Sequence, residues 1–297
     1  MASAKRIDAT KGPIVRQILL YSYPLVLSTL VQSLFNAVDV AVLGNMADST
    51  AVAAVGATGS ITNLMVNFFV GLSVGAGVTV AHALGSRENT VVHNTVHTAL
   101  PIALVSGSLL TLVGVSFSGT FLRWMGTPDT VLPLSSLYMK IYFAGITFTM
   151  VYNFCASILR AAGDTKSPLI FLSLAGVINV VLNFLLIYET RVLKIFGIEF
   201  TMFGAGLGVI GAAVASAVAF TIGGILITIV LWKHPFLSPK GQKIAPDGEI
   251  LLPCLKVAFP NMLQRFGTSL GFVAFASMIN SLGEVSTAAH TIANTVE

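Results

Sequence analysis

Long, nearly uninterrupted apolar runs constrain this chain more than any other feature of its sequence. A membrane-spanning helix needs roughly 20 mostly apolar residues. Seven segments reach that length, at 18–44, 52–84, 95–121, 136–158, 168–188, 204–232 and 253–282, and an eighth begins at 285. Because a backbone in lipid must satisfy its own hydrogen bonds, the runs predict helices and an all-α membrane protein.

Composition supports the same conclusion. The chain is 55% hydrophobic and only 9% charged, whereas a soluble domain carries about 25% charged residues. Its basic residues are scattered singly, so nucleic acid is not an expected partner. The sequence contains no GxSxG, HExxH or GxxxxGK[ST] motif, and Cys155 and Cys254 lack metal-ligand spacing. We therefore expect neither an enzyme nor a cofactor.

The distribution of Lys and Arg predicts the orientation. With the N-terminus in the cytoplasm, eleven of these residues fall in inside segments and four outside, with Arg265 within the seventh segment. Such a bias is typical of a cytoplasmic N-terminus. Arg265 itself is expected to snorkel or to pair with a group outside this sequence. His82, His93 and His97 lie near helix ends and are expected to be exposed.

The stretch 233–250 is the longest polar interruption and predicts a cytoplasmic linker. After it the opening pattern returns: superposing Pro260 on Pro24, an offset of 236 residues, aligns 47–54 with 283–290 without a gap. The repeat predicts a six-helix lobe at 1–232 and the start of a second lobe at 251–297, related by an axis along the membrane normal. We expect the whole protein to be about twice 236 residues long.

Polar groups inside membrane spans are the strongest indicators of function, because each is costly there. Of twelve acids, only Asp39 lies within the body of a span. It follows Ile18 by about 21 residues, or ~31 Å along a helix, which places it in the outer half. An acid there suits cation exchange with the outside. The alternative is an acid that caps the first helix and faces outer water.

The fifth span adds Asn179 and Asn183, whose i, i+4 spacing puts them on one face. With Asp39 they predict a polar pocket suited to a proton or to Na+. The alternative for the amides is hydrogen bonding between helices. Weaker pocket-lining candidates are Gln32, Asn36, Asn67 and Ser216.

The segment ILRAAGDTKSP (158–168) closely resembles the signature of the multidrug and toxin extrusion (MATE) family of secondary transporters. Its residues suit a structural hairpin, in which basic side chains hold the cytoplasmic turn, Gly163 allows the reversal and Pro168 starts the next helix. The signature residues are Arg160, Gly163, Asp164, Lys166 and Pro168. Similar stretches recur along nearly the whole chain, including 208–219.

The resemblance implies twelve helices in two lobes, of which this chain holds the first six, the seventh and the beginning of the eighth. It implies export of amphipathic or cationic organic compounds across a bacterial inner membrane in exchange for H+ or Na+. The family's cation site matches Asp39 and Asn179, and its helix bend matches Pro24. Many bacterial members carry a second acid where this chain has Asn183, which favours protons over Na+.

Two other functions stay open at this stage. One is a lipid-linked oligosaccharide flippase of the same superfamily, whose cavities resemble the expected one but carry several cationic residues, where only Arg265 qualifies here. The other is a non-transporting membrane component in which the buried polar groups only hold helices together. Transport by two rocking lobes requires the remainder of the second lobe, so membrane lipid, a small solute and that remainder are the expected partners.

The topology can be tested by labelling a cysteine placed in the linker. In a background without Cys155 and Cys254, Ser238→Cys should react with a membrane-impermeant maleimide only after the membrane is opened, because the linker is predicted to be cytoplasmic. Labelling from outside intact cells would overturn the predicted orientation.

Overall fold

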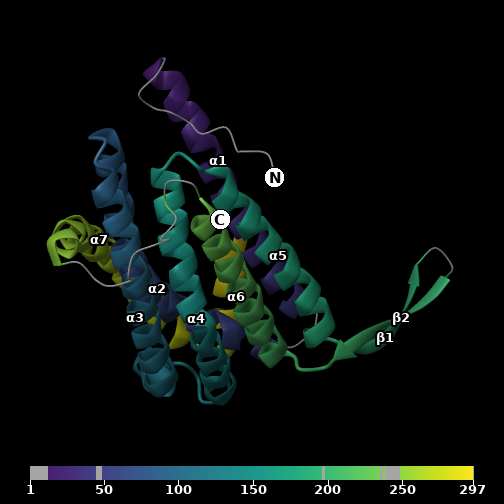
Figure 1. Cartoon of the computed structure of the whole chain (residues 1–297). Helices are drawn as coiled ribbons and strands as arrows, with labels where there is room; N and C mark the ends of the chain where they lie inside the picture. Colours follow the sequence, from purple (N-terminus) through teal and green to yellow (C-terminus); the bar gives the residue numbers. More distant parts are fainter. Residues whose placement is uncertain (1–12, 45–48, 196–197, 235–236, 238–247, 297) are drawn as a thin grey trace.

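The computed structural model describes residues 13–44, 49–195, 198–234, 237 and 248–296. The described residues form a bundle of long helices (Figure 1). The helices are α1 (Ile14–Gly44), α2 (Ser49–Gly85), α3 (Asn89–Trp124), α4 (Leu132–Ala161), α5 (Lys166–Ile187), α6 (Val209–Lys233), α7 (Gly248–Asn280) and α8 (Glu284–Val296). The predicted spans and the start of an eighth helix coincide with these helices, apart from one or two residues at the ends of the fifth and seventh spans and the first five residues of the sixth.

Between α5 and α6 lies a β-hairpin that the sequence analysis missed. Strands β1 (Glu189–Ile195) and β2 (Ile198–Ala205) pair antiparallel, with Lys194 opposite Glu199. The hairpin projects away from the bundle between α5 and α6 (Figure 1). The sixth span was predicted to begin at 204, but α6 begins at Val209, because residues up to Ala205 belong to β2.

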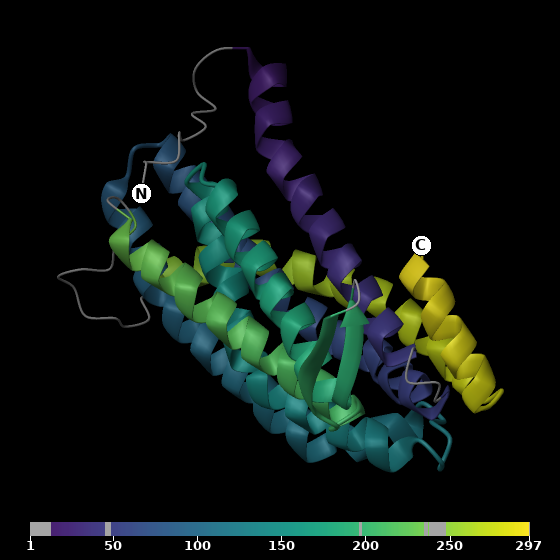
Figure 2. The same cartoon turned by 90° about the vertical axis from the view of Figure 1, so that its right-hand side faces the viewer.

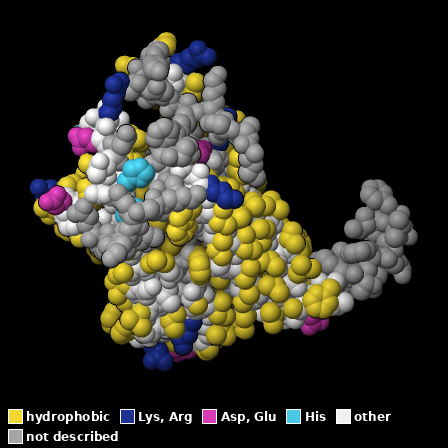
Figure 3. All heavy atoms as spheres, in the orientation of Figure 1, with side chains coloured by type: hydrophobic (Ala, Val, Ile, Leu, Met, Phe, Trp, Pro, Cys, Tyr) yellow, Lys and Arg dark blue, Asp and Glu magenta, His cyan; other side chains and the backbone are white. Residues whose placement is uncertain are grey.

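Six helices in the described part of the chain are long and apolar enough to cross a membrane, namely α1 to α6. Helix α7 has 33 residues but is not among the six. Two prolines, Lys256 and Arg265 make α7 less apolar than those six helices, although the sequence predicted a seventh span there. Hydrophobic side chains cover the middle of the bundle, and charged ones gather at its upper and lower ends (Figure 3). This pattern matches a protein that spans a bilayer.

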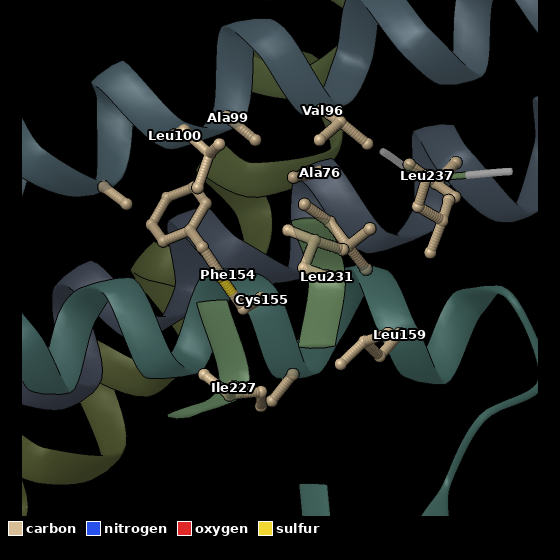
Figure 4. Packing of buried hydrophobic residues seen from close by; sticks show 14 of the residues in the cluster. Ala76, Val96, Ala99, Leu100, Phe154, Cys155, Leu159, Ile227, Leu231 and Leu237 are labelled. Carbon is tan, nitrogen blue, oxygen red and sulfur yellow. The ribbon is translucent and has the colours of Figure 1, made fainter. Parts of the chain in front are cut away.

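Helix α4 lies at the centre, where it contacts α2, α3 and α6. Of the most apolar stretch of α4, 56% is buried, whereas only 6% of the corresponding stretch of α1 is buried. Apolar side chains from four helices meet around α4 (Figure 4): Ala76 of α2; Val96, Ala99 and Leu100 of α3; Phe154, Cys155 and Leu159 of α4; Ile227 and Leu231 of α6. This cluster fixes the inner wall of the bundle.

Glycines let α2 approach α7 closely. A Cβ added at Gly71 would lie 2.8 Å from the Met262 Cα, and one at Gly75 would overlap the Cys254 carbonyl oxygen. Gly77 instead faces Ser157 of α4. Since lipid tails provide no hydrophobic force between helices, such backbone contact is a main source of attraction.

Helix α1 is the least enclosed span, and its N-terminal half stands away from the other helices (Figures 1 and 2). Pro24 lies inside this continuous helix, where it removes one backbone hydrogen bond. The C-terminal end is anchored, because Val42 and Leu43 pack with Ile187 and Val209. Helix α1 is thus held firmly at one end only.

The signature hairpin joins α4 to α5 through a left-handed glycine. Gly163 has φ +84°, and the Asp164 N–H donates to the Leu159 carbonyl at 2.9 Å, a bonding pattern that closes helix C-termini. The Asp164 carboxylate then accepts from the Ser167 N–H at 3.0 Å and from its hydroxyl at 2.6 Å. Asp164 therefore caps α5, as a carboxylate does at a helix start.

Packing of α2 on α7 can be tested by adding one methyl group at Gly75. Gly75→Ala forces the α7 backbone to shift, and overpacking of this kind costs roughly 1–3 kcal/mol. We expect the unfolding temperature of the detergent-solubilised protein, followed by tryptophan fluorescence, to fall by roughly 2–10 °C.

The matched control lies in the same helix. Gly59 has nothing within 4 Å of an added Cβ, so Gly59→Ala should leave the unfolding temperature unchanged or slightly raised. Equal losses in both variants would contradict the assigned packing.

Candidate functional site

A cavity of about 630 Å³ lies between six helices, a volume in the range of sites for drug-sized molecules. Its polar lining comes from Ser28, Thr29, Gln32 and Ser33 of α1, Asn63 and Asn67 of α2, Thr149, Asn153 and Arg160 of α4, Asn179 of α5, Ser216 of α6 and Arg265 of α7. Aromatic side chains complete it: Phe35, Tyr138, Tyr142, Tyr152 and Phe220. The lining combines hydrogen-bonding groups with flat apolar surfaces.

Buried amides connect α5 to α6 at one wall. Asn183 donates from Nδ2 to Asn179 Oδ1 at 2.9 Å, and Asn179 donates from Nδ2 to the Ser216 hydroxyl at 3.0 Å. Asn183 is fully buried and Asn179 is 6% exposed. These two hydrogen bonds fix the orientation of the Asn179 amide, which lines the cavity. The Asn179–Ser216 bond joins α5 to α6, whereas the Asn183–Asn179 bond lies within α5.

Two contacts show which residues of α1 lie beside which residues of α5. The Phe35 ring packs where Gly176 has no side chain, and the Tyr188 hydroxyl donates to the Val42 carbonyl at 3.0 Å. Position 39 lies between these contacts along α1, four residues after Phe35. Asn179 and Asn183 lie between the same contacts along α5. The side chains of Asp39 and Asn36 lie outside the described part of the structure.

The other predicted residues divide into two groups. Gln32, Asn67, Asn179 and Ser216 line the cavity, while Asn183 lies behind Asn179. In the signature hairpin, Gly163, Asp164 and Lys166 belong to the turn and the start of α5, away from the described lining.

Two residues of the signature hairpin also reach the cavity. Arg160 and Pro168 both line the cavity. The Tyr152 hydroxyl donates to the Pro168 carbonyl at 2.8 Å. This bond joins α4 to α5 at the cavity wall, near the turn that connects the two helices. Arg160 extends back along α4, where its Nε donates to the Ala156 carbonyl at 3.0 Å.

Sequence reasoning missed the tyrosines and misplaced one histidine. Tyr138 and Tyr142 stack with ring centroids 6.4 Å apart, and their i, i+4 spacing on the fourth span was the available signal. His97 was expected to be exposed, but only 4% of its surface is exposed. It lies eight residues, about two turns, after the start of α3, where the neighbouring helices cover it.

No group of three or more His, Cys, Asp or Glu in the described ranges is arranged to hold a metal ion. The described lining offers amide, hydroxyl and guanidinium groups. These suit reversible binding of a solute through hydrogen bonds and aromatic contact.

Comparison with known proteins gives consistent matches. The MatE family profile matches residues 24–185. The probable multidrug resistance protein YoeA of Bacillus subtilis (strain 168) is 30% identical over 292 residues, covering 97% of this chain and 60% of that protein. The chain therefore spans less than two thirds of the length of this relative.

Solved structures share the fold. An outward-facing multidrug resistance MATE family transporter matches with a TM-score of 0.79 at 20% identity, over 100% of this chain and 68% of the other. An inward-facing one matches with a TM-score of 0.77 at 23% identity, over 92% and 60%. The chain is thus a multi-pass membrane protein with the fold of these transporters over their shared region.

The buried amide chain makes a stability prediction. Asn179 is its central member, so Asn179→Ala removes the bond from Asn183 and the bond to the Ser216 hydroxyl together, at a cost of about 1–3 kcal/mol. Ser216→Ala removes only the terminal acceptor and should cost less.

Thermal unfolding of the two single variants and the double variant in detergent measures this difference. The double variant should be less destabilised than the sum of the single ones, because the two residues share a bond. Additive effects would show that the amide chain does not connect α5 to α6.

Proposed function

Because the chain belongs to the MatE family, we propose that it forms the first lobe and the opening of the second lobe of a membrane exporter. The transporter moves amphipathic or cationic organic compounds out of the cell in exchange for H+ or Na+. The names of the relatives indicate multidrug transport, and the cavity offers a space in which a solute could bind. Export requires the remainder of the second lobe, because two lobes must rock around a shared site.

The observation that carries this proposal is the mixed polar and aromatic cavity between α1, α2, α4, α5, α6 and α7. In a packing-only membrane protein such polar groups would pair with one another. Here Gln32 is exposed to the cavity rather than packed between helices. A space of about 630 Å³ lined in this way favours binding of solutes of varied shape.

Coupling to a cation is assigned to Asp39. It is the only acid within the body of a span, and it lies level with Asn179 and Asn183 between the two α1–α5 contacts. A proton from outside neutralises its carboxylate, and the loss of a charge at that level changes how α1 packs on α5. Because only 6% of the most apolar part of α1 is buried, α1 is the helix that moves most easily and alters the cavity.

The same residues suit Na+ less well. A site for Na+ would use the Asp39 carboxylate with amide oxygens, yet the Asn179 Oδ1 already accepts from Asn183. Proton coupling needs only one carboxylate that gains and loses a proton. We therefore favour H+ as the coupling ion, in a bacterial inner membrane with the N-terminus in the cytoplasm.

A lipid-linked oligosaccharide flippase is the second candidate, and one observation favours it. Arg160 joins Arg265 in the lining, so the cavity holds two cations where the sequence suggested one. Movement of a lipid-linked anion between leaflets of reconstituted vesicles, without exchange for H+ or Na+, would support this function over export.

The coupling role predicts the behaviour of Asp39→Asn in the full-length protein. The amide matches the protonated carboxyl in size but cannot release a proton, so gradient-driven accumulation of a fluorescent solute inside everted vesicles should fall to background. Expression and membrane insertion should be unchanged.

A matched control is Glu88→Gln, which neutralises an exposed acid in the loop between α2 and α3. It should export at the wild-type rate under an imposed H+ gradient. Export by Asp39→Asn at the wild-type rate under either an H+ or a Na+ gradient would refute the coupling assignment.

A further inference from the structure

Two tyrosines lie side by side in the wall of the cavity. Tyr138 and Tyr142 come from successive turns of α4, and both line the cavity. Their rings are nearly parallel, with an interplanar angle of 19° and centroids 6.4 Å apart. Both side chains are only partly buried. This tyrosine pair therefore offers two neighbouring aromatic surfaces to a solute in the cavity.

The tyrosine pair lies at the same end of the bundle as Asp39. Tyr138 packs against the apolar cluster that contains Val42 of α1. Val38, the residue before Asp39, packs against that cluster too. Asp39 is the only acid in the body of a span, so the tyrosine pair lies at the end of the cavity nearest to it.

Arg160, one of two arginines in the lining, lies towards the opposite end of the cavity. It follows Tyr142 by 18 residues on one continuous helix, which corresponds to ~27 Å along α4. Its Nε donates to the Ala156 carbonyl at 3.0 Å. A cation bound at the tyrosine pair would therefore lie far from this guanidinium.

Arg265, the other arginine in the lining, also lies at a different level from the tyrosine pair. The ring of its neighbour Phe266 contacts the ring of Phe68 on α2, with centroids 6.0 Å apart. Phe68 lies 13 residues, or ~20 Å, further along α2 than Val55. Val55 packs against the same cluster as Tyr138. The charges along the cavity are thus arranged unevenly, with the acid near the tyrosine pair and both basic groups away from it.

This arrangement favours a positively charged group at the tyrosine pair. The face of a tyrosine ring attracts an organic cation by about 0.5–2 kcal/mol, and quaternary ammonium groups are bound in this way. The acid at this end adds to the attraction, whereas the two guanidiniums repel a cation from the other levels. Aromatic rings also tolerate cations of varied shape, because the attraction needs no fixed hydrogen-bond geometry.

Resting on the proposed transport function, we infer that Tyr138 and Tyr142 bind the cationic group of the amphipathic compounds that enter the cavity, while the rest of the lining contacts the apolar part. This assigns the selection for positive charge to two named rings. It also orients the solute, with its charged end towards the level of Asp39.

The test compares two probes of the same shape, (2-naphthylmethyl)trimethylammonium and its uncharged carbon analogue 2-neopentylnaphthalene. Binding to the full-length protein in dodecylmaltoside, an uncharged detergent, is measured by equilibrium dialysis and corrected for uptake by empty micelles. Tyr142→Leu should weaken binding of the ammonium by about 2- to 30-fold, the loss expected for one cation–π contact. The affinity for the neutral analogue should stay nearly unchanged, because leucine keeps an apolar surface there.

Two further variants separate the aromatic ring from folding and from the hydroxyl group. Tyr142→Phe keeps the ring and should retain most of the affinity for the ammonium. Phe117→Leu is the matched control, because Phe117 and Phe121 form an aromatic pair with the same spacing on α3, and Phe117 is exposed and is not among the described lining residues. It should leave both affinities unchanged.

Several results would overturn the inference. These are equal weakening of both probes by Tyr142→Leu, no effect of that variant on the ammonium, or a loss with Tyr142→Phe as large as with Tyr142→Leu. The last result would assign the binding to the hydroxyl group and not to the ring.

A transport measurement separates this inference from the proposed function. Everted vesicles that accumulate the ammonium at a rate unaffected by Tyr142→Leu, at a concentration below saturation, would support the proposed function and refute the tyrosine site. Binding of the ammonium that Tyr142→Leu weakens selectively, without gradient-driven accumulation by the wild-type protein, would refute the proposed function and support the tyrosine site.

Discussion

Close contact between helix backbones at small residues is the interaction on which the rest of this structure depends. Lipid does not drive apolar helices together, so they associate by shape and by hydrogen bonds. Gly75 brings α2 against the α7 backbone, and Gly145 and Gly224 bring α4 and α6 together through contacts with Ala217 and Phe148. With α4 fixed at the centre, the remaining helices diverge on one side, and the cavity is the space between them.

That arrangement explains why one helix is suited to move. Helices α2, α4 and α6 each pack against several helices, whereas α1 contacts mainly α5. Pro24 lies within α1 and removes one of its backbone hydrogen bonds. The residues that α1 contributes to the cavity, from Leu25 to Phe35, lie between the proline and the anchored end. In the proposed transporter, a change in charge at position 39 acts close to the part of α1 that lines the cavity.

Much of the fold could be predicted from the sequence because apolar runs of this length have one solution in lipid. The hairpin at 189–205 could not, because its short strands lie between two spans and resemble a loop by composition. Arg160 was correctly placed at the end of the fourth span, but its entry into the cavity depends on how α4 packs against α1 and α5. Asn183 and Asn179 share a face, as their spacing predicted, yet only the packing of α6 brings Ser216 to them.

In the proposed transporter, the cavity between α1, α2, α4, α5, α6 and α7 holds the transported solute. Crystals of the full-length protein soaked with a brominated form of an exported compound test this most directly, because bromine gives an anomalous signal at a defined position. We expect a bromine peak inside the cavity, beside residues such as Asn67 and Tyr142. A peak found only outside this cavity, in crystals of protein shown to export the compound, would contradict it.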